Sequence, residues 1–147
     1  YLARTRLRED GFMGDFVKYY DGAFCEAGNL GRESIVVHDV WHPRMVWSEL
    51  HGCYVMTATR MTPGGRWPFV DDVMQIRTSE DMIHWSEPRE VEVEGKPFGN
   101  HYVAMVSDGE EGEPYVIGGE SFSILTNHNG TDVMRYPARW VKKSTGR

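Results

Sequence analysis

Residues 78–88 read TSEDMIHWSEP, and this stretch decides how the surrounding chain is expected to fold. Ser79 and Asp81 are placed to close a tight turn through hydrogen bonds from backbone N–H groups to their side chains. Trp85 follows the aspartate by four positions, and we expect it to pack the outer strand of one sheet against a neighbouring sheet. The stretch therefore predicts architecture and not a ligand site.

Short runs rich in β-branched, aromatic and Met residues lie on both sides of this turn. Several alternate apolar and polar residues with a period of two, as half-buried strands do. Turn signals built from Gly, Pro, Asn and Asp separate the runs. The expected strands are 44–50, 53–60, 73–79, 89–95, 101–107, 114–120 and 132–142. The pattern predicts an all-β, antiparallel protein.

The strands recur as a unit of four. Residues 43–93 give PRMVWSELHG, CYVMTATR, VMQIRTSED and HWSEPREVEV in order. The order then restarts with NHYVAMVSDG, EPYVIGGES, FSILTNHNGTD and VMRYPARWVKK. Residues 15–30 look like the last two strands of a preceding unit. Repeated four-stranded antiparallel units are typical of propeller blades, each of which needs neighbours on both sides.

This reading makes residues 1–147 a single half-propeller unit. A partial blade would cover 15–40, one blade 41–95 and another blade 96–143. Roughly two and a half blades do not close a ring. Either the chain is a fragment or a second copy completes the ring, and two copies give five blades. Because two-fold dimers are the commonest soluble assemblies, we expect a homodimer.

At this point the residues resemble a known family, the five-bladed propeller glycoside hydrolases of the family 43 and family 32 type. TSEDMIHWSEP is similar to the outer-strand turn of those blades, and VWHPRMVWSELHGCYVMTATR (40–60) looks like their inner hairpin. NHNGTDVMRY (127–136) looks like a variant of the outer turn. The resemblance covers roughly residues 15–142 and concerns the fold more than the activity.

The resemblance implies catalysis by carboxylates near the starts of inner strands, one donating a proton while another stays ionised. Asp39 is then the candidate base or nucleophile, and Asp72 a candidate acid. Asn100 and His101 stand where the family places a carboxylate, so its acid motif is missing. The alternative is a binding propeller that holds a sugar or another small ligand without the catalytic carboxylates. A third reading is a fragment or mobile-gene product with an unrelated ligand.

The predicted site is a funnel formed by segments 38–44, 61–72 and 97–102. Aromatic rings can cover the C–H face of a sugar while charged groups bond its hydroxyls. The predicted substrate-binding residues are Trp41, His42, Arg44, Trp67, Asn100 and His101. Other roles stay open, since Asp39 is equally suited to capping a turn or pairing with Arg44, and Trp67 to anchoring a dimer. A metal site at His38, His42 and His101 lacks a local ligand motif, so no metal or cofactor is expected.

The net charge of −6 argues against nucleic acid or an anionic membrane as the main partner. No apolar run has the length of a membrane span. The expected partners are a carbohydrate or another polar small molecule, and a second copy of the chain. The two cysteines are expected to be buried free thiols. No signal peptide is visible, which slightly favours a cytoplasmic location, but the chain starts at Tyr1 and export stays open.

Overall fold

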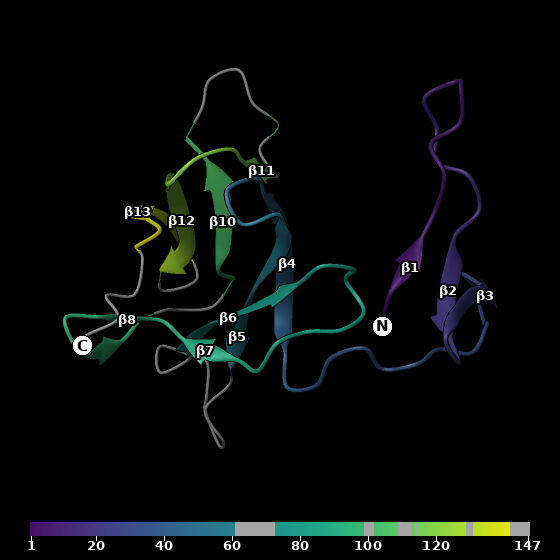
Figure 1. Ribbon diagram of the computed structural model, residues 1–147, viewed down its shortest axis with the longest axis horizontal. Helices are drawn as coiled ribbons and strands as arrows, with labels where there is room; N and C mark the ends of the chain where they lie inside the picture. Colours follow the sequence, from purple (N-terminus) through teal and green to yellow (C-terminus); the bar gives the residue numbers. More distant parts are fainter. Residues whose placement is uncertain (61–72, 99–101, 109–112, 114, 129–130, 142–147) are drawn as a thin grey trace. The chain divides into compact units, whose positions relative to one another are not determined.

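The computed structural model describes the chain except for residues 61–72, 99–101, 109–112, 114, 129–130 and 142–147. Every regular element in the described residues is a β-strand, and most strand pairs are antiparallel (Figure 1). The prediction of an all-β protein is therefore confirmed. The chain divides into two compact units, Tyr1–His38 and Asp39–Arg147.

The first unit is a three-stranded antiparallel sheet in the order β1 (Ala3–Arg4), β2 (Val17–Tyr20) and β3 (Ala23–Ala27). Strands β2 and β3 form a hairpin whose turn residues, Asp21 and Gly22, have φ angles of 47° and 85°. Two successive positive φ angles are typical of the tight turn that matches the twist of paired strands. The strand pair expected within residues 15–30 is thus present.

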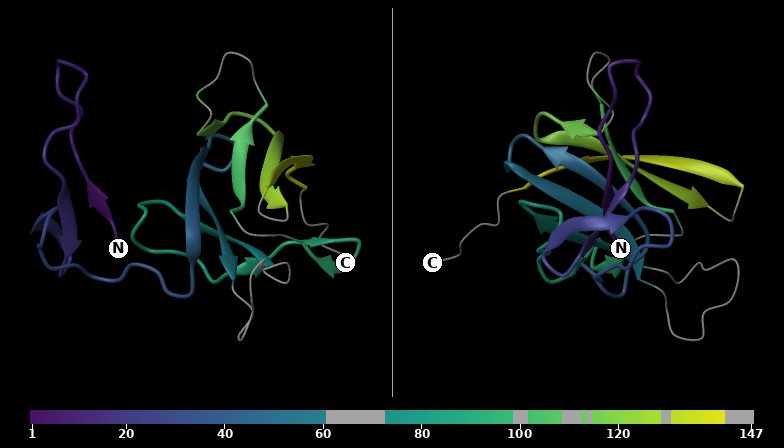
Figure 2. Two further views of the ribbon diagram at one scale, coloured as in Figure 1. Left: turned by 180° about the vertical axis from the view of Figure 1, so that it is seen from behind. Right: turned by 90° about the vertical axis from the view of Figure 1, so that its right-hand side faces the viewer.

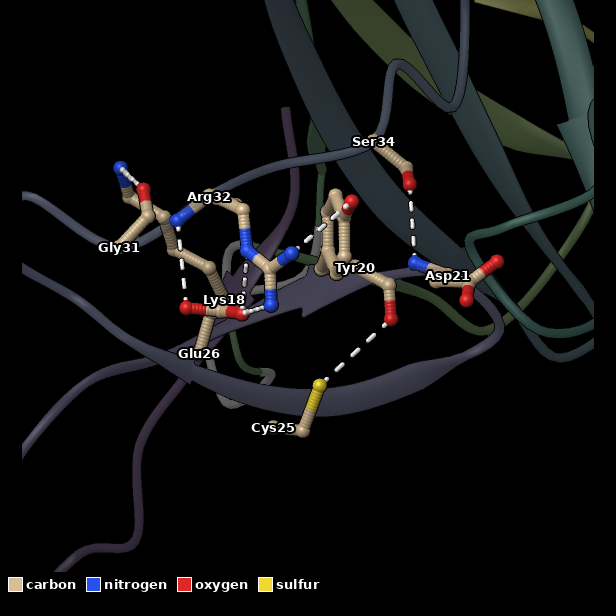
Figure 3. A network of polar contacts seen from close by, with 8 residues as sticks. All are labelled: Lys18, Tyr20, Asp21, Cys25, Glu26, Gly31, Arg32 and Ser34. Carbon is tan, nitrogen blue, oxygen red and sulfur yellow. Dashed lines mark hydrogen bonds and ion pairs between the residues drawn. The ribbon is translucent and has the colours of Figure 1, made fainter.

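None of the residues of the first unit is fully buried, so the unit has no apolar core of its own. Polar contacts link its strands and loops instead. Figure 3 shows the Arg32 guanidinium beside Glu26, to which it donates a hydrogen bond of 2.6 Å, and near the ring of Tyr20. The guanidinium carbon lies 4.3 Å from the Tyr20 ring centroid. The hydrogen bond from Arg32 lowers the pKa of Glu26. Cys25 is exposed in this unit, contrary to the expectation of a buried thiol.

Four consecutive strands of the second unit form an antiparallel meander, seen in blue to teal in Figure 1. They are β4 (Trp41–Ser48), β5 (Cys53–Arg60), β6 (Val73–Ser79) and β7 (Arg89–Glu90). The expected strands 53–60 and 73–79 are found with the same bounds, and the strand expected at 44–50 begins three residues earlier. The expected strand 89–95 is divided, since β7 ends at Glu90 and Glu92–Val93 (β8) pairs instead with Lys96–Pro97 (β9).

The second half of this unit differs from the expected repeat. Strand β10 (Ala104–Ser107) pairs directly with β12 (Ser121–His128), which pairs with β13 (Asp132–Arg139). The β12–β13 hairpin is seen along its length in the right-hand view of Figure 2. The expected strand 114–120 is shortened to β11 (Val116–Ile117), which joins the first sheet in parallel beside β4. The four-stranded order is therefore not repeated in the described residues.

Burial explains why β11 leaves the expected order. Ile117 is completely buried in the core, and the backbone N–H groups of Trp47 and Glu49 donate hydrogen bonds to the carbonyls of Tyr115 and Ile117. Pairing with β4 thus satisfies backbone groups of an otherwise open sheet edge and buries an apolar side chain in the same step.

One hydrophobic core joins the two larger sheets of the second unit. Its buried members come from β4, β5, β6 and β11 on one side and from the β10 and β12 region on the other. They are Val46, Val55, Met74, Val103, Met105, Ile117, Phe122 and Ile124. Burying such apolar surface is the main stabilising contribution available to a chain of this size.

The turn between β6 and β7 has the predicted hydrogen bonds. The Ser79 hydroxyl oxygen accepts from the backbone N–H of Met82 at 2.9 Å, and Asp81 Oδ1 accepts from the N–H groups of Ile83 and His84 at 2.8 Å. The hydrogen bonds that the N–H groups of His84 and Ile83 donate hold the pKa of the Asp81 carboxyl well below its usual range. Trp85 Nε1 donates to the Met82 carbonyl at 3.0 Å. The prediction that Ser79 and Asp81 close the turn is confirmed.

Candidate functional site

A pocket of about 480 Å³ lies where the chain enters β4 and passes over β5 and β6. Its walls combine one indole ring, one carboxylate, one amide, two guanidinium groups and small side chains. They are Asp39, Val40, Trp41, Thr59, Arg60, Gln75, Arg77 and Pro88. We call it the sheet pocket.

The strand register places the polar walls of the sheet pocket on one face of the sheet. Side chains alternate between the two faces along a strand. Met74 and Ile76 of β6 pack in or against the core, so Gln75 and Arg77 project from the opposite face. In the β5–β6 register, Ala58 pairs with Gln75 and Arg60 pairs with Val73, which places Arg60 on that same face. Arg60, Gln75 and Arg77 therefore share one face of the sheet with the buried Ala58 and Val73, whereas Thr59 pairs with Met74 on the core side.

Gln75 fixes the backbone at the rim of the pocket. Its side chain is only 2% exposed, and its Nε2 donates a 2.7 Å hydrogen bond to the carbonyl of Asp39, 36 residues earlier in the chain. Asp39 has a φ of 56°, a left-handed conformation that is uncommon for residues other than glycine. The Asp39 side chain itself is exposed. The buried Gln75 amide therefore stabilises an unusual backbone conformation at Asp39, which lines the rim of the pocket.

An irregularity in β4 orients the aromatic wall. The register of β4 against β5 shifts between Trp41 and Arg44, and His42 within the shift has a φ of 49°. Trp41 Nε1 donates to His42 Nε2 at 2.7 Å, and the His42 ring stacks on Tyr102 with centroids 4.2 Å apart. Bulges of this kind redirect side chains and are frequent beside binding sites. The Trp41 ring, 38% exposed, is thereby held at the pocket.

The two arginines of the pocket differ in their contacts. Arg60 Nη2 forms an ion pair of 2.7 Å with Glu90, and both side chains are half-exposed. The Arg60 Nε is buried, and no described residue supplies it with an acceptor. Arg77 Nη1 makes a long contact of 3.4 Å with the Ser86 carbonyl. The Arg60 Nε donor thus has unused hydrogen-bonding capacity next to the cavity.

The predicted site residues are distributed unevenly around this pocket. Asp39 and Trp41 line it, whereas His42 is not a lining residue and accepts the hydrogen bond from Trp41. Arg44 bonds to the neighbouring Pro43 carbonyl and does not line the pocket. His42 stacks on Tyr102, which brings one residue of segment 38–44 against the last residue of segment 97–102. Trp67, Asp72, Asn100 and His101 lie outside the described residues.

Sequence reasoning did not select the pocket residues contributed by β5 and β6. These are Thr59, Arg60, Gln75 and Arg77. A usable signal is present in VMQIRTS (73–79), where Gln75 and Arg77 alternate with Met74 and Ile76. This alternation marks a polar face, and a buried glutamine on such a face is a candidate for holding backbone or ligand.

The first unit has a larger hollow of about 890 Å³. Its polar walls are Asp15, Asn29 and Glu26, and Glu26 is already paired with Arg32. Among the described residues, no group of three or more His, Cys, Asp or Glu side chains is close enough to hold a metal ion. The same residues contain no helix that is long and apolar enough to cross a membrane.

Comparison of the chain with protein-family models, with curated proteins and with solved structures finds no match. The chemistry of the sheet pocket is therefore the main indication of what the protein binds.

Proposed function

We propose that the protein binds a carbohydrate in the sheet pocket. The observation that carries this proposal is the convergence of the Trp41 ring, the Asp39 carboxylate and the Arg60 and Arg77 guanidinium groups on one cavity. An aromatic face packs against the C–H patch of a sugar ring, while carboxylate and guanidinium groups hydrogen-bond its hydroxyls. A volume of about 480 Å³ suits a ligand of one or two sugar rings.

Binding is favoured over hydrolysis by the number of carboxylates. Glycoside hydrolysis requires an acid and a base or nucleophile about 5–10 Å apart. Asp39 is the one carboxylate that lines the pocket among the described residues. Hydrolysis stays the second candidate, because Asp72 immediately precedes Val73, the partner of the pocket residue Arg60 in the strand register.

The architecture that we propose for this function is a five-bladed propeller built from two copies of the chain. The four-stranded meander β4–β7 supports it, because it has the strand order of a single blade. The exposed outer strand β13, where Val133 is 70% exposed, is consistent with a further contact. Sedimentation velocity should give a stable dimer, and a chain that stays monomeric at micromolar concentration would disprove this assembly.

Isothermal titration calorimetry against a panel of neutral and acidic monosaccharides tests sugar binding. We expect saturable binding that is lost in Trp41→Ala, because truncation removes the platform for the sugar ring. The matched control is Tyr115→Ala, since Tyr115 is 68% exposed and lies outside the pocket. Absence of binding for every sugar, or equal binding by both variants, would contradict the proposal.

Chromogenic arabinosides, xylosides, fructosides and galactosides separate binding from hydrolysis. If the chain hydrolyses one of them, Asp39→Asn should abolish turnover and leave the fold intact. Saturable binding without turnover supports the binding role. Turnover that survives in Asp39→Asn would remove Asp39 from a catalytic role.

A further inference from the structure

We propose that the ligand of the sheet pocket is an acidic sugar whose carboxylate binds beside Arg60 and Arg77. This inference rests on the proposed sugar-binding function and specifies its substrate class. The reasons are the placement of the two arginines, the unused donor of Arg60 and the charge of the pocket walls.

The two guanidinium groups can reach one ligand. Arg60 is opposite Val73, and Arg77 lies four residues further along β6, with Gln75 midway between these β6 positions. Four residues of a strand span about 13 Å, and two arginine side chains that converge from the ends of this span bring their heads toward its middle. Both line the same cavity, so a bound group over Gln75 lies within reach of each.

Arg60 has more support than Arg77 as the residue that binds the ligand carboxylate. Its Nη2 is engaged by Glu90, but its Nε donor is buried and has no acceptor among the described residues. Leaving a buried donor unsatisfied is unfavourable, and a ligand oxygen at this place would remove that cost. Arginine also presents its donors as a planar fork that matches the two oxygens of a carboxylate.

The charges around the cavity favour an anion on the sugar. Two guanidinium groups and one carboxylate line the pocket, and that carboxylate, on Asp39, is exposed at the rim. Glu90 does not line the pocket, but it stands opposite Gln75 in the β6–β7 register and pairs with Arg60 Nη2. A ligand carboxylate can therefore bind beside Arg60 at the Nε donor that Glu90 leaves unused, with Arg77 as the second positive group of the lining. Asp39 is then placed to accept from hydroxyls, and Trp41 to cover the ring.

The test compares sugars that differ only in the acidic group. Calorimetry with glucuronate and glucose, and with galacturonate and galactose, should show about 10- to 100-fold tighter binding of one acidic member, as a charge-assisted hydrogen bond provides. The preference should weaken as ionic strength rises from about 0.01 M to 1 M, because the pocket is open to solvent. Acetate alone should bind far more weakly than the acidic sugar, since it lacks the ring that Trp41 covers.

Variants of pocket residues test whether the pocket causes the preference for the acidic sugar. Arg60→Gln should lower the affinity for the acidic sugar much more than the affinity for the neutral one and so remove the preference, while Arg60→Lys should restore only part of it. Arg139→Gln is the matched control, since Arg139 is exposed on β13 and does not line the pocket.

The outcomes separate this inference from the proposed function. Equal affinity for acidic and neutral sugars, or a preference that survives Arg60→Gln, overturns the acidic-sugar inference and leaves sugar binding in place. Binding of acetate as tight as that of the acidic sugar overturns it as well, because the site would then recognise an anion alone. Failure of all the sugars to bind overturns the proposed function.

Discussion

Replacing Gln75 should destabilise the protein even though its partner lies in an exposed segment. In Gln75→Met the side chain keeps nearly the same length, so that no large cavity forms, but the 2.7 Å hydrogen bond to the Asp39 carbonyl is lost. Loss of one partner of a largely buried hydrogen bond costs about 1–3 kcal/mol. Because Asp39 is exposed and water can reach it after the change, we expect the lower part, about 1–2 kcal/mol.

Urea denaturation followed by tryptophan fluorescence measures this loss as a lower midpoint with an unchanged m value. Gln75→Glu supplies a second measurement, because a carboxylate cannot donate to the Asp39 carbonyl but a protonated carboxyl group can. The free energy of unfolding of Gln75→Glu should therefore approach that of the wild-type protein as the pH falls toward about 4. A loss below about 0.5 kcal/mol in Gln75→Met, within the range of ordinary surface changes, would refute the structural role of this bond.

Three further changes probe the turn, the core and the second sheet. Ser79→Ala should cost about 1–2 kcal/mol in urea denaturation, because the turn loses its hydroxyl acceptor, and no loss would contradict its role. Met74→Ala should cost about 2–5 kcal/mol, since Met74 is fully buried, whereas Met45→Ala, at 38% exposure, should cost far less; equal losses would show that the core is misplaced. Hydrogen bonds from Ser123 and then Arg135 lower the pKa of Asp108, so its stabilising contribution is present above about pH 4 and lost as the pH falls through the lowered value. Urea midpoints at pH 7 and pH 3 should therefore differ less in Asp108→Asn than in the wild-type protein.

Local patterns were sufficient to predict strands β5 and β6 and the turn that follows β6. Apolar and polar residues alternate in VMQIRTS (73–79), and the turn TSEDMIHWSEP (78–88) has its own hydrogen-bonding side chains. Strand β6 and the turn after it therefore follow from residues close in sequence. The same holds for the β2–β3 hairpin, whose Asp21-Gly22 turn is a short-range signal.

The rest of the fold was harder to predict, because the partner of a strand in a sheet depends on residues far away in the sequence. PYVIGGE (114–120) has the composition of a strand, but its composition does not say which strand it joins. Ile117 gains complete burial beside β4 in the first sheet, and this gain depends on residues about 70 positions earlier. The predicted repeat rests on the order of strand-like runs and the spacing of turn residues, which do not specify strand pairing, so it places β11 in the wrong sheet.

The candidate site was predicted in part for the same reason. Asp39 and Trp41 were selected because they precede an expected strand, and both line the pocket. Gln75 and Arg60 were not selected, because they belong to strand interiors and ends where polar residues are commonly surface positions. Only the pairing of Ala58 with Gln75, together with the bond from Gln75 to Asp39, places these residues at one cavity.

The parallel pairing of β11 with β4 has a consequence during synthesis of the chain. Val116 pairs with Trp47, 69 positions earlier. At about 5–20 residues per second, Val116 leaves the ribosome roughly 3–14 s after Trp47. During this interval the outer edge of β4 has no partner from β11, although β5 is already available to pair with its other side and β6 with β5. The nascent sheet therefore exposes an open edge for seconds, and a second nascent chain nearby can pair with it before β11 arrives.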